Sequence, residues 1–191
     1  MAEESDIQPG ITAVLKQIRL GNDEARRELF RLVYDDLHRM AKQQMQKERK
    51  DHTLQTTAIV HEAFIRMVGS DGLEVLADRA HFLAVAGRTM RQLLIDHARM
   101  RKAQRRGGAG NRVLIDDVLD DFEQRHSVDY LDLEDALGEL SQLDVRQGQI
   151  VELRFFAGLS VKETADYLGV SSSTVEKDFK SARSWLNLRL Q

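Results

Sequence analysis

The chain of 191 residues has no cysteine and a single proline, Pro9. Without cysteine, neither a disulfide nor a thiolate metal site can form, and a reducing compartment fits this composition. No apolar run approaches the roughly 18–20 residues that cross a bilayer. The first ten residues, MAEESDIQPG, are acidic and polar, unlike a signal peptide. We therefore expect a cytoplasmic protein without a membrane segment.

Patterns for catalysis and metal binding are also missing. His61-Glu62 begins like the zinc motif HExxH, but Ile65 stands where the second histidine belongs. The other histidines have no ligand spacing, and no nucleophile elbow or dinucleotide-binding glycine pattern is present. We expect no enzyme activity, no metal site and no cofactor.

Strand-like runs of β-branched residues are scarce, and helical periodicity dominates instead. Apolar residues recur at helical spacing over residues 11–48, from about 56 to 68, and from about 78 to 105. Gly21-Asn22-Asp23 interrupts the first stretch, and Asn22 or Asp23 is expected to cap a helix that begins near Glu24. The predicted fold class is therefore all-α.

The distribution of charge divides the chain, although the net charge is only -3. From residue 79 to 112 the charged residues are basic except Asp96, whereas from 116 to 139 they are acidic except Arg125. We predict two small helical domains, residues 1–106 and 133–191, joined by an acidic flexible linker at 107–132. The opposite charges would allow the linker to cover the basic segment.

The segment from Leu159 to Lys180 has the spacing of a helix-turn-helix. Ala165 is small where two helices approach closely, Gly169 allows the positive φ of the tight turn, and Val175 packs against the first helix. A serine among residues 171–173 would cap the second helix, whose exposed N-terminal face would enter the major groove. An ordinary helical hairpin would use the same glycine and serines only as caps. The predicted DNA contacts are Ser172, Ser173, Thr174, Lys177, Lys180 and Arg183.

Other segments resemble a known family. Asp135-Ala-Leu-Gly-Glu-Leu140 and the stretch from Ile150 to Ser160 are similar to region 4 of sigma-70-type RNA polymerase sigma factors. Ile59-Val-His-Glu-Ala-Phe-Ile-Arg66 resembles region 2.2, and the stretch from Phe82 to Arg99 resembles regions 2.3 and 2.4. The extracytoplasmic-function (ECF) group is most similar, because it contains only regions 2 and 4.

The resemblance implies a sigma factor that binds core RNA polymerase and directs promoter-specific initiation. Region 4 would read −35 promoter DNA and touch the polymerase β flap, while region 2 would bind the β′ clamp helices and melt and read the −10 element. On this basis the predicted −10 contacts are Arg88, Arg91, Gln92, Arg99, Arg101 and Lys102. Their charge would neutralise phosphates, although a basic helix can also be merely a solvated surface.

The predicted polymerase-binding residues depart from the family pattern, in which acidic residues open region 2.2. They are Gln55, Thr56, Thr57, Ala58, Glu62 and Arg66, of which only Glu62 is acidic. We hypothesise that phosphorylation of Thr56 or Thr57 restores negative charge at a helix N-terminus. The simpler alternative is that one of these threonines caps the helix. Control by an anti-sigma factor or a Ser/Thr kinase would fit.

Two other functional classes compete with this interpretation. A response regulator also ends in a helix-turn-helix, but it needs an N-terminal receiver of alternating strands and helices, and residues 1–100 have helical periodicity. A helical protein–protein adaptor would explain the N-terminal half and leave the C-terminal motif without a role.

Overall fold

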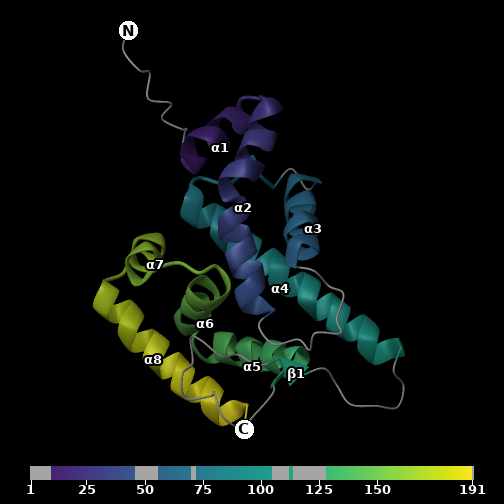
Figure 1. Ribbon diagram of the computed structural model, residues 1–191. Helices are drawn as coiled ribbons and strands as arrows, with labels where there is room; N and C mark the ends of the chain where they lie inside the picture. The colour runs from purple at the N-terminus through teal and green to yellow at the C-terminus, as the bar shows by residue number, and fades with distance from the viewer. Residues whose placement is uncertain (1–9, 46–55, 70–71, 105–111, 114–127, 191) are drawn as a thin grey trace.

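The computed structural model describes residues 10–45, 56–69, 72–104, 112–113 and 128–190, and these residues form an all-α fold, as predicted (Figure 1). A short antiparallel ladder, in which Arg112 pairs with Asp129, lies between the helical halves. In chain order the elements are α1 (Ile11–Arg19), α2 (Glu24–Gln44), α3 (Thr56–Gly69), α4 (Arg79–Gln104), β1 (Arg112–Val113), β2 (Val128–Asp129), α5 (Tyr130–Leu143), α6 (Val145–Val151), the π-helix η2 (Glu152–Phe156), α7 (Val161–Leu168) and α8 (Ser172–Arg189).

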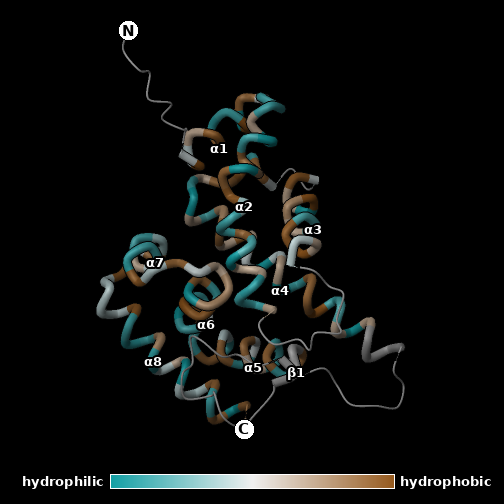
Figure 2. The backbone as a smooth tube through the Cα atoms, in the orientation of Figure 1, coloured by the Kyte–Doolittle hydropathy of each residue, from teal (hydrophilic) through white to brown (hydrophobic). Residues whose placement is uncertain are grey.

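Helices α1 to α4 form the N-terminal bundle. Each buries an apolar stripe and exposes a polar face, and the alternation along α2 is visible in Figure 2. Leu29, Leu37, Phe82 and Met90 are fully buried in this bundle. In the turn between α1 and α2, the side-chain oxygen of Asn22 accepts a hydrogen bond from the Glu24 N–H at 3.0 Å. Of the two predicted caps, Asn22 is therefore the one that bonds to the start of α2.

Helices α5, α6, α7 and α8, with η2, form the C-terminal domain. Leu140, Phe156, Ala182 and Leu186 belong to its main buried cluster, which joins α5, η2 and α8. The helix α5 begins at Tyr130, so the last residues of the predicted linker are already helical. The rest of that linker, with its acidic cluster, lies outside the described residues apart from the two short strands.

The two halves of the molecule pack against each other. Leu153, Ala157 and Leu159 come from the C-terminal domain, yet they lie in the buried cluster of the N-terminal bundle. Helix α4 packs along η2 and α5 and also touches α7. Part of the C-terminal domain therefore completes the core of the N-terminal bundle, while α5, η2 and α8 keep a separate buried cluster.

Candidate nucleic-acid interface

The predicted helix-turn-helix is formed by α7 and α8. A capping box starts α7: the Ser160 hydroxyl accepts from the Glu163 N–H at 3.2 Å, and the Glu163 carboxylate accepts from the Ser160 N–H at 2.8 Å. The helix ends at Gly169, whose φ of 66° is left-handed. The Ser171 hydroxyl then accepts from the Thr174 N–H at 3.1 Å and starts α8. The predicted turn and serine cap are both present.

Two sets of contacts fix the orientation of α8. Ile150, Ala165 and Val175 form a small buried cluster that joins α6, α7 and α8. The buried carboxylate of Asp178 accepts a hydrogen bond from Arg146 on α6 at 2.6 Å. Sequence reasoning missed this ion pair because its partners lie on separate helices, and the acidic residue within a basic helix gave no indication of burial.

The exposed face of α8 carries most of the predicted −35 contacts. Ser172, Ser173, Lys177 and Lys180 are exposed. Thr174 is half-buried, and its hydroxyl hydrogen-bonds with that of Ser171 at 2.8 Å. A helix with a capped N-terminus and with exposed lysines and serines on its outer face has the chemistry for major-groove DNA.

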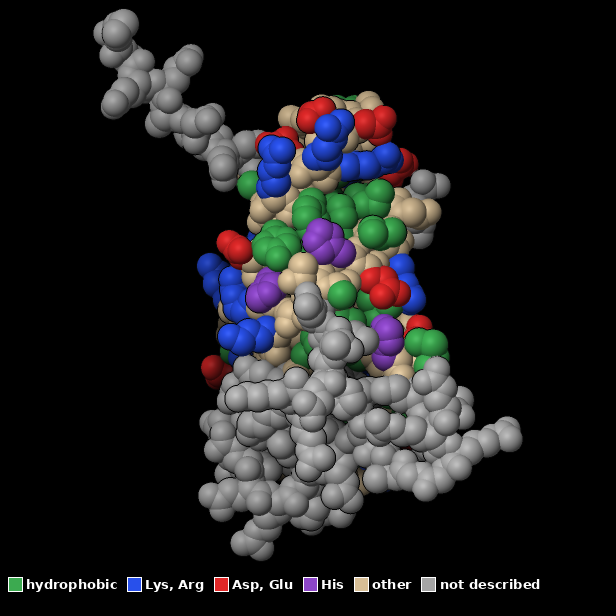
Figure 3. Space-filling model, turned by 45° about the vertical axis from the view of Figure 1, so that its right-hand side comes forward, with side chains coloured by type: hydrophobic (Ala, Val, Ile, Leu, Met, Phe, Trp, Pro, Cys, Tyr) green, Lys and Arg blue, Asp and Glu red, His purple; other side chains and the backbone are tan. Residues whose placement is uncertain are grey.

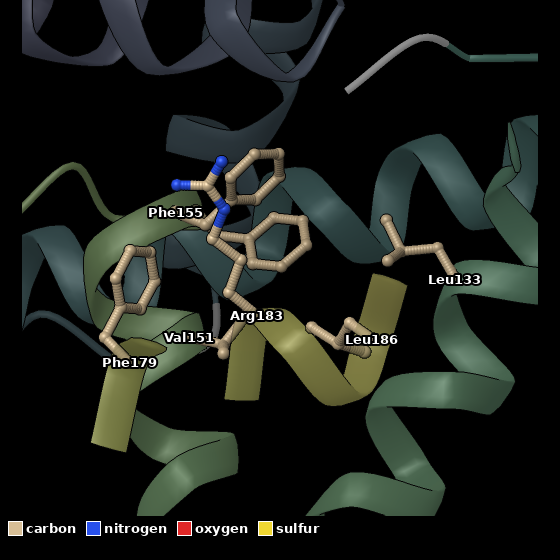
Figure 4. A pocket seen from close by; sticks show the side chains of 7 residues that line it. Leu133, Val151, Phe155, Phe179, Arg183 and Leu186 are labelled. Carbon is tan, nitrogen blue, oxygen red and sulfur yellow. The ribbon is translucent and has the colours of Figure 1, made fainter. Parts of the chain in front are cut away.

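Arg183 lies apart from that face. It is half-buried and helps to line an apolar pocket between α5, η2 and α8 (Figure 4). In the close-up its stem passes beside Phe155, and Phe179 lies on the other side. Arg183 stays a predicted DNA contact, but its stem packs among apolar neighbours, unlike the exposed Lys177 and Lys180. The pocket is lined by Leu133, Val151, Phe155, Phe156, Phe179, Arg183 and Leu186.

The predicted −10 contacts all lie on α4 but differ in exposure. Arg88, Gln92 and Arg99 are exposed, and Gln92 donates a hydrogen bond to Asp96 at 2.9 Å. The backbones of residues 101 and 102 belong to α4, whereas the side chains of Arg101 and Lys102 are outside the description.

Arg91 is the exception on α4, since only 16% of its side chain is exposed. It donates to Glu134 of α5 and pairs with Glu152 of η2 at 2.8 Å, and its guanidinium lies 5.3 Å from the centroid of the Phe156 ring. Burial raises the pKa of the Glu152 carboxyl, against the opposing effect of Arg91 and Arg88. The predicted DNA-binding cation is thus held between two carboxylates of the other half.

The predicted polymerase-binding residues lie along α3. Thr56 and Thr57 are its first two residues, half-buried and exposed respectively, and the first turn of the helix contains no acid. Ala58 is exposed, and Glu62 pairs with Arg66 at 3.0 Å. Gln55 lies outside the described residues.

An aromatic cluster next to α3 was not predicted. Phe30 of α2 contacts the rings of His61 and Phe64 of α3, with centroids 5.1 and 4.7 Å apart. Hydrophobic side chains and histidines gather on the bundle face shown in Figure 3. Phe30 and Phe64 lie in the stretches of helical periodicity, 11–48 and 56–68, and that periodicity does not show that the two rings meet. The spacing of these aromatic residues on their own helices was the only available signal.

Together, a basic helix in an N-terminal bundle and a complete C-terminal helix-turn-helix define a two-part helical DNA-binding protein. The ECF sigma factor family matches residues 8–191. This match covers nearly the whole chain, which therefore belongs to the ECF sigma factor family, as the resemblance indicated. It is a sigma factor, a class that directs transcription with RNA polymerase at promoters. The response-regulator alternative has no support, because residues 10–45, 56–69 and 72–104 form helices α1–α4 with no strand among them.

Among solved structures, the chain is similar to CnrH, solved in complex with the cytosolic domain of CnrY. The two chains are 20% identical, the TM-score is 0.44, and the alignment covers 93% of this chain and 94% of CnrH. A comparison with curated proteins gives no match. In the part of the chain that the structure describes, no helix is long and apolar enough to span a bilayer, and no group of three or more His, Asp or Glu residues is arranged to hold a metal ion.

The left-handed glycine of the turn generates the first prediction. Gly169→Ala should lower the free energy of unfolding by about 1 kcal/mol, because an L side chain is strained at a φ of 66°. Gly138→Ala is the matched control, since Gly138 lies within α5 and nothing stands within 4 Å of an added Cβ. The control should be as stable as wild type or more stable. Denaturant unfolding followed by circular dichroism measures both, and equal stability of the two variants would contradict the turn geometry.

A second prediction concerns the capping box. The hydrogen bond from the Ser160 N–H, aided by the Ser160 side chain and Arg79, holds the pKa of Glu163 below its ordinary value of 4.5. A lowered pKa stabilises the fold above the unfolded-state value, and the effect is lost as pH falls through the folded-state value. Glu163→Gln keeps the hydrogen bond without the charge, so it should be less stable than wild type at neutral pH by under about 1 kcal/mol. Unfolding curves across pH should show this gap closing in acid, and a constant gap would count against the assignment.

Proposed function

We propose that this sigma factor contacts promoter DNA at two elements, −35 and −10, while it is bound to core RNA polymerase. Residues 133–191 act as a region 4-like domain that reads −35 DNA with α8. Residues 1–106 act as a region 2-like domain that binds polymerase and reads −10 DNA with α4. The observation that carries this proposal is the exposed face of α8. Ser173, Lys177 and Lys180 are exposed there, and the helix begins with a side-chain cap at Ser171.

The −35 contact follows from the geometry of α8. Val175 and Asp178 hold the inner side of the helix on α6 and α7, so the outer side is the one that can enter a groove. Lysines there supply phosphate contacts, and the exposed serines supply hydrogen bonds to bases or phosphates. Arg183 is a weaker candidate, because it lies at the apolar pocket.

The −10 contact rests on α4. Arg88 and Arg99 are exposed cations, and Gln92 between them can offer an amide to an unpaired base. Arg91 belongs to this surface only when it leaves Glu134 and Glu152.

For polymerase itself, we propose that the α3 surface around Thr57, Glu62 and Arg66 binds the β′ clamp helices and that the C-terminal domain touches the β flap. An anti-sigma factor remains a proposed partner on the strength of the family alone.

A third prediction tests the sigma function. Core RNA polymerase supplemented with this protein alone should start transcripts at defined sites on genomic DNA, as mapped from transcript 5′ ends. Lys177→Ala should lower this initiation about tenfold, because it removes a contact from the α8 face. Lys16→Ala is the matched control: it removes the same charge from the exposed surface of α1 and should initiate like wild type. Absence of protein-dependent start sites with both the parent and Thr57→Glu would overturn the proposed promoter-specific initiation, whereas an unaffected Lys177→Ala would overturn only the role of α8.

We also propose that phosphorylation of Thr57 or Thr56 by a Ser/Thr kinase strengthens polymerase binding. Both threonines lie in the first turn of α3, which has no acid, and Thr57 is the more exposed. A phosphate there adds roughly −1.5 to −2 charge where the helix dipole favours it. A purely capping role is less well supported, because α3 already includes both threonines as helical residues.

A fourth prediction follows from this phosphorylation. Thr57→Glu should bind core polymerase about three- to tenfold more tightly than Thr57→Ala, from a charge effect of about 1 kcal/mol. Thr12→Glu is the matched control, because Thr12 is the exposed second residue of α1, another helix with no acid in its first turn. Both Glu variants gain the same helix-dipole interaction, so only Thr57→Glu should change affinity. Equal affinities for the two Thr57 variants, measured by fluorescence anisotropy, would rule out the phosphate switch.

A further inference from the structure

Helix α8 contains two acidic residues, and their surroundings differ. The carboxylate of Asp178 is buried and accepts a hydrogen bond from Arg146 at 2.6 Å. Glu176 is exposed, and its carboxylate makes no hydrogen bond or ion pair with another described residue, although Lys180 lies one turn further along the helix. Asp178 therefore holds α8 in place, whereas the described structure gives Glu176 no such role.

Glu176 belongs to the outer side of α8. Buried residues such as Val175 and Ala182 mark the inner side of the helix. Glu176 shares the outer side with Ser173 and Lys180, which lie three residues before and four residues after it and are also exposed. The helix itself runs along the outer edge of the C-terminal domain (Figure 1). A DNA groove that meets Ser173 and Lys180 would therefore also meet the carboxylate of Glu176.

A carboxylate on a DNA-binding face is repelled by phosphates and needs a hydrogen-bond donor on the DNA. In the major groove the bases offer two such donors, the N4 amine of cytosine and the N6 amine of adenine. Adenine presents its amine beside N7, an acceptor that repels a second carboxylate oxygen, and guanine and thymine present only acceptors there. A carboxylate in the groove therefore favours cytosine over the other three bases.

The other exposed residues of this face do not make that selection. No arginine occurs among residues 172–182, so the first turns of α8 lack the bidentate arginine contact that reads guanine. Lys177 and Lys180 are compact cations that suit phosphates, and the exposed serines can donate or accept and so tolerate several bases. Among the exposed side chains of residues 172–180, only Glu176 is restricted to accepting hydrogen bonds.

We propose that Glu176 is a specificity-determining residue of the −35 contact and accepts a hydrogen bond from the N4 amine of a cytosine in the major groove. The inference rests on the proposed reading of −35 DNA by α8 and adds the identity of one base to it. Lys177, the next residue, offsets the repulsion between this carboxylate and the phosphates. The −35 element of this protein therefore contains a cytosine at one fixed position, and any other base there weakens binding.

Selection from a library of random DNA duplexes tests this assignment. The full-length protein, with and without core polymerase, should enrich a motif in which one position prefers cytosine by about fivefold or more, as expected for one base contact. Glu176→Gln should change that position to adenine, because a glutamine amide bonds to both N6 and N7 of adenine. Glu176→Ala should lose the preference at that position alone and should bind random DNA more tightly, because a repulsive charge is gone.

Asp135→Asn is the matched control. It also removes one exposed negative charge from the C-terminal domain, but Asp135 interacts electrostatically with Arg189 at the far end of α8. This variant should enrich the same motif as the parent. Denaturant unfolding should show equal stability for the parent and both Glu176 variants, because the Glu176 side chain is exposed.

The possible outcomes separate this inference from the proposed function. A motif without a cytosine position, or one that both Glu176 variants leave unchanged, would overturn base reading by Glu176. Tighter binding of both variants with an unchanged motif would reduce Glu176 to an electrostatic effect and would overturn it as well. Transcript initiation on the enriched duplexes is measured separately with core polymerase. Its absence beside a cytosine motif that depends on Glu176 would count against promoter-specific initiation and not against the role of Glu176.

Discussion

The approach of the Phe156 backbone to Gly87 is the constraint on which the arrangement of the two halves depends. Because α4 has no side chain there, η2 comes close enough for Gln44 to reach the Phe156 carbonyl. The same approach brings Glu152 within 2.8 Å of Arg91 and buries Leu153 in the N-terminal core. The π-helical turn widens the backbone where this happens, and such turns are often found at functional sites. One missing Cβ thus permits a hydrogen bond, an ion pair and a shared core.

The same contact occupies Arg91, a predicted DNA contact, with carboxylates of the protein itself. A guanidinium makes its best hydrogen bonds to carboxylate or phosphate oxygens, and Arg91 cannot serve both at once. Burial raises the pKa of the Glu152 carboxyl and so disfavours its charged form, whereas the neighbouring Arg91 and Arg88 favour that form. A buried ion pair of this kind adds little net stability, but it favours one specific geometry of the contact.

Local features of the fold could be predicted from the sequence, and non-local features could not. The helix-turn-helix depends on Ala165, Gly169 and Val175, whose spacing is set within two adjacent helices. Periodicity likewise placed α3 and α4 close to their observed ends. The partners of Arg91, however, lie on other helices, and nothing in the local pattern identifies them. A glycine at position 87 indicates, from local sequence alone, only a weak point in a helix, because its neighbour Phe156 is distant in the sequence.

The two helices proposed to bind DNA differ in whether their predicted contacts are already exposed. On α8 the Ser171 cap, the Arg146–Asp178 pair and the buried Val175 fix the helix while its lysines stay exposed, so the proposed −35 contact needs no rearrangement within the C-terminal domain. On α4, Arg91 would have to leave Glu134 and Glu152 before it could contact DNA. A glycine inside a helix costs about 1 kcal/mol relative to alanine, and in α4 this local cost allows the close approach of η2. The −10 contact proposed for α4 therefore depends first on Arg88, Gln92 and Arg99, whose side chains are exposed.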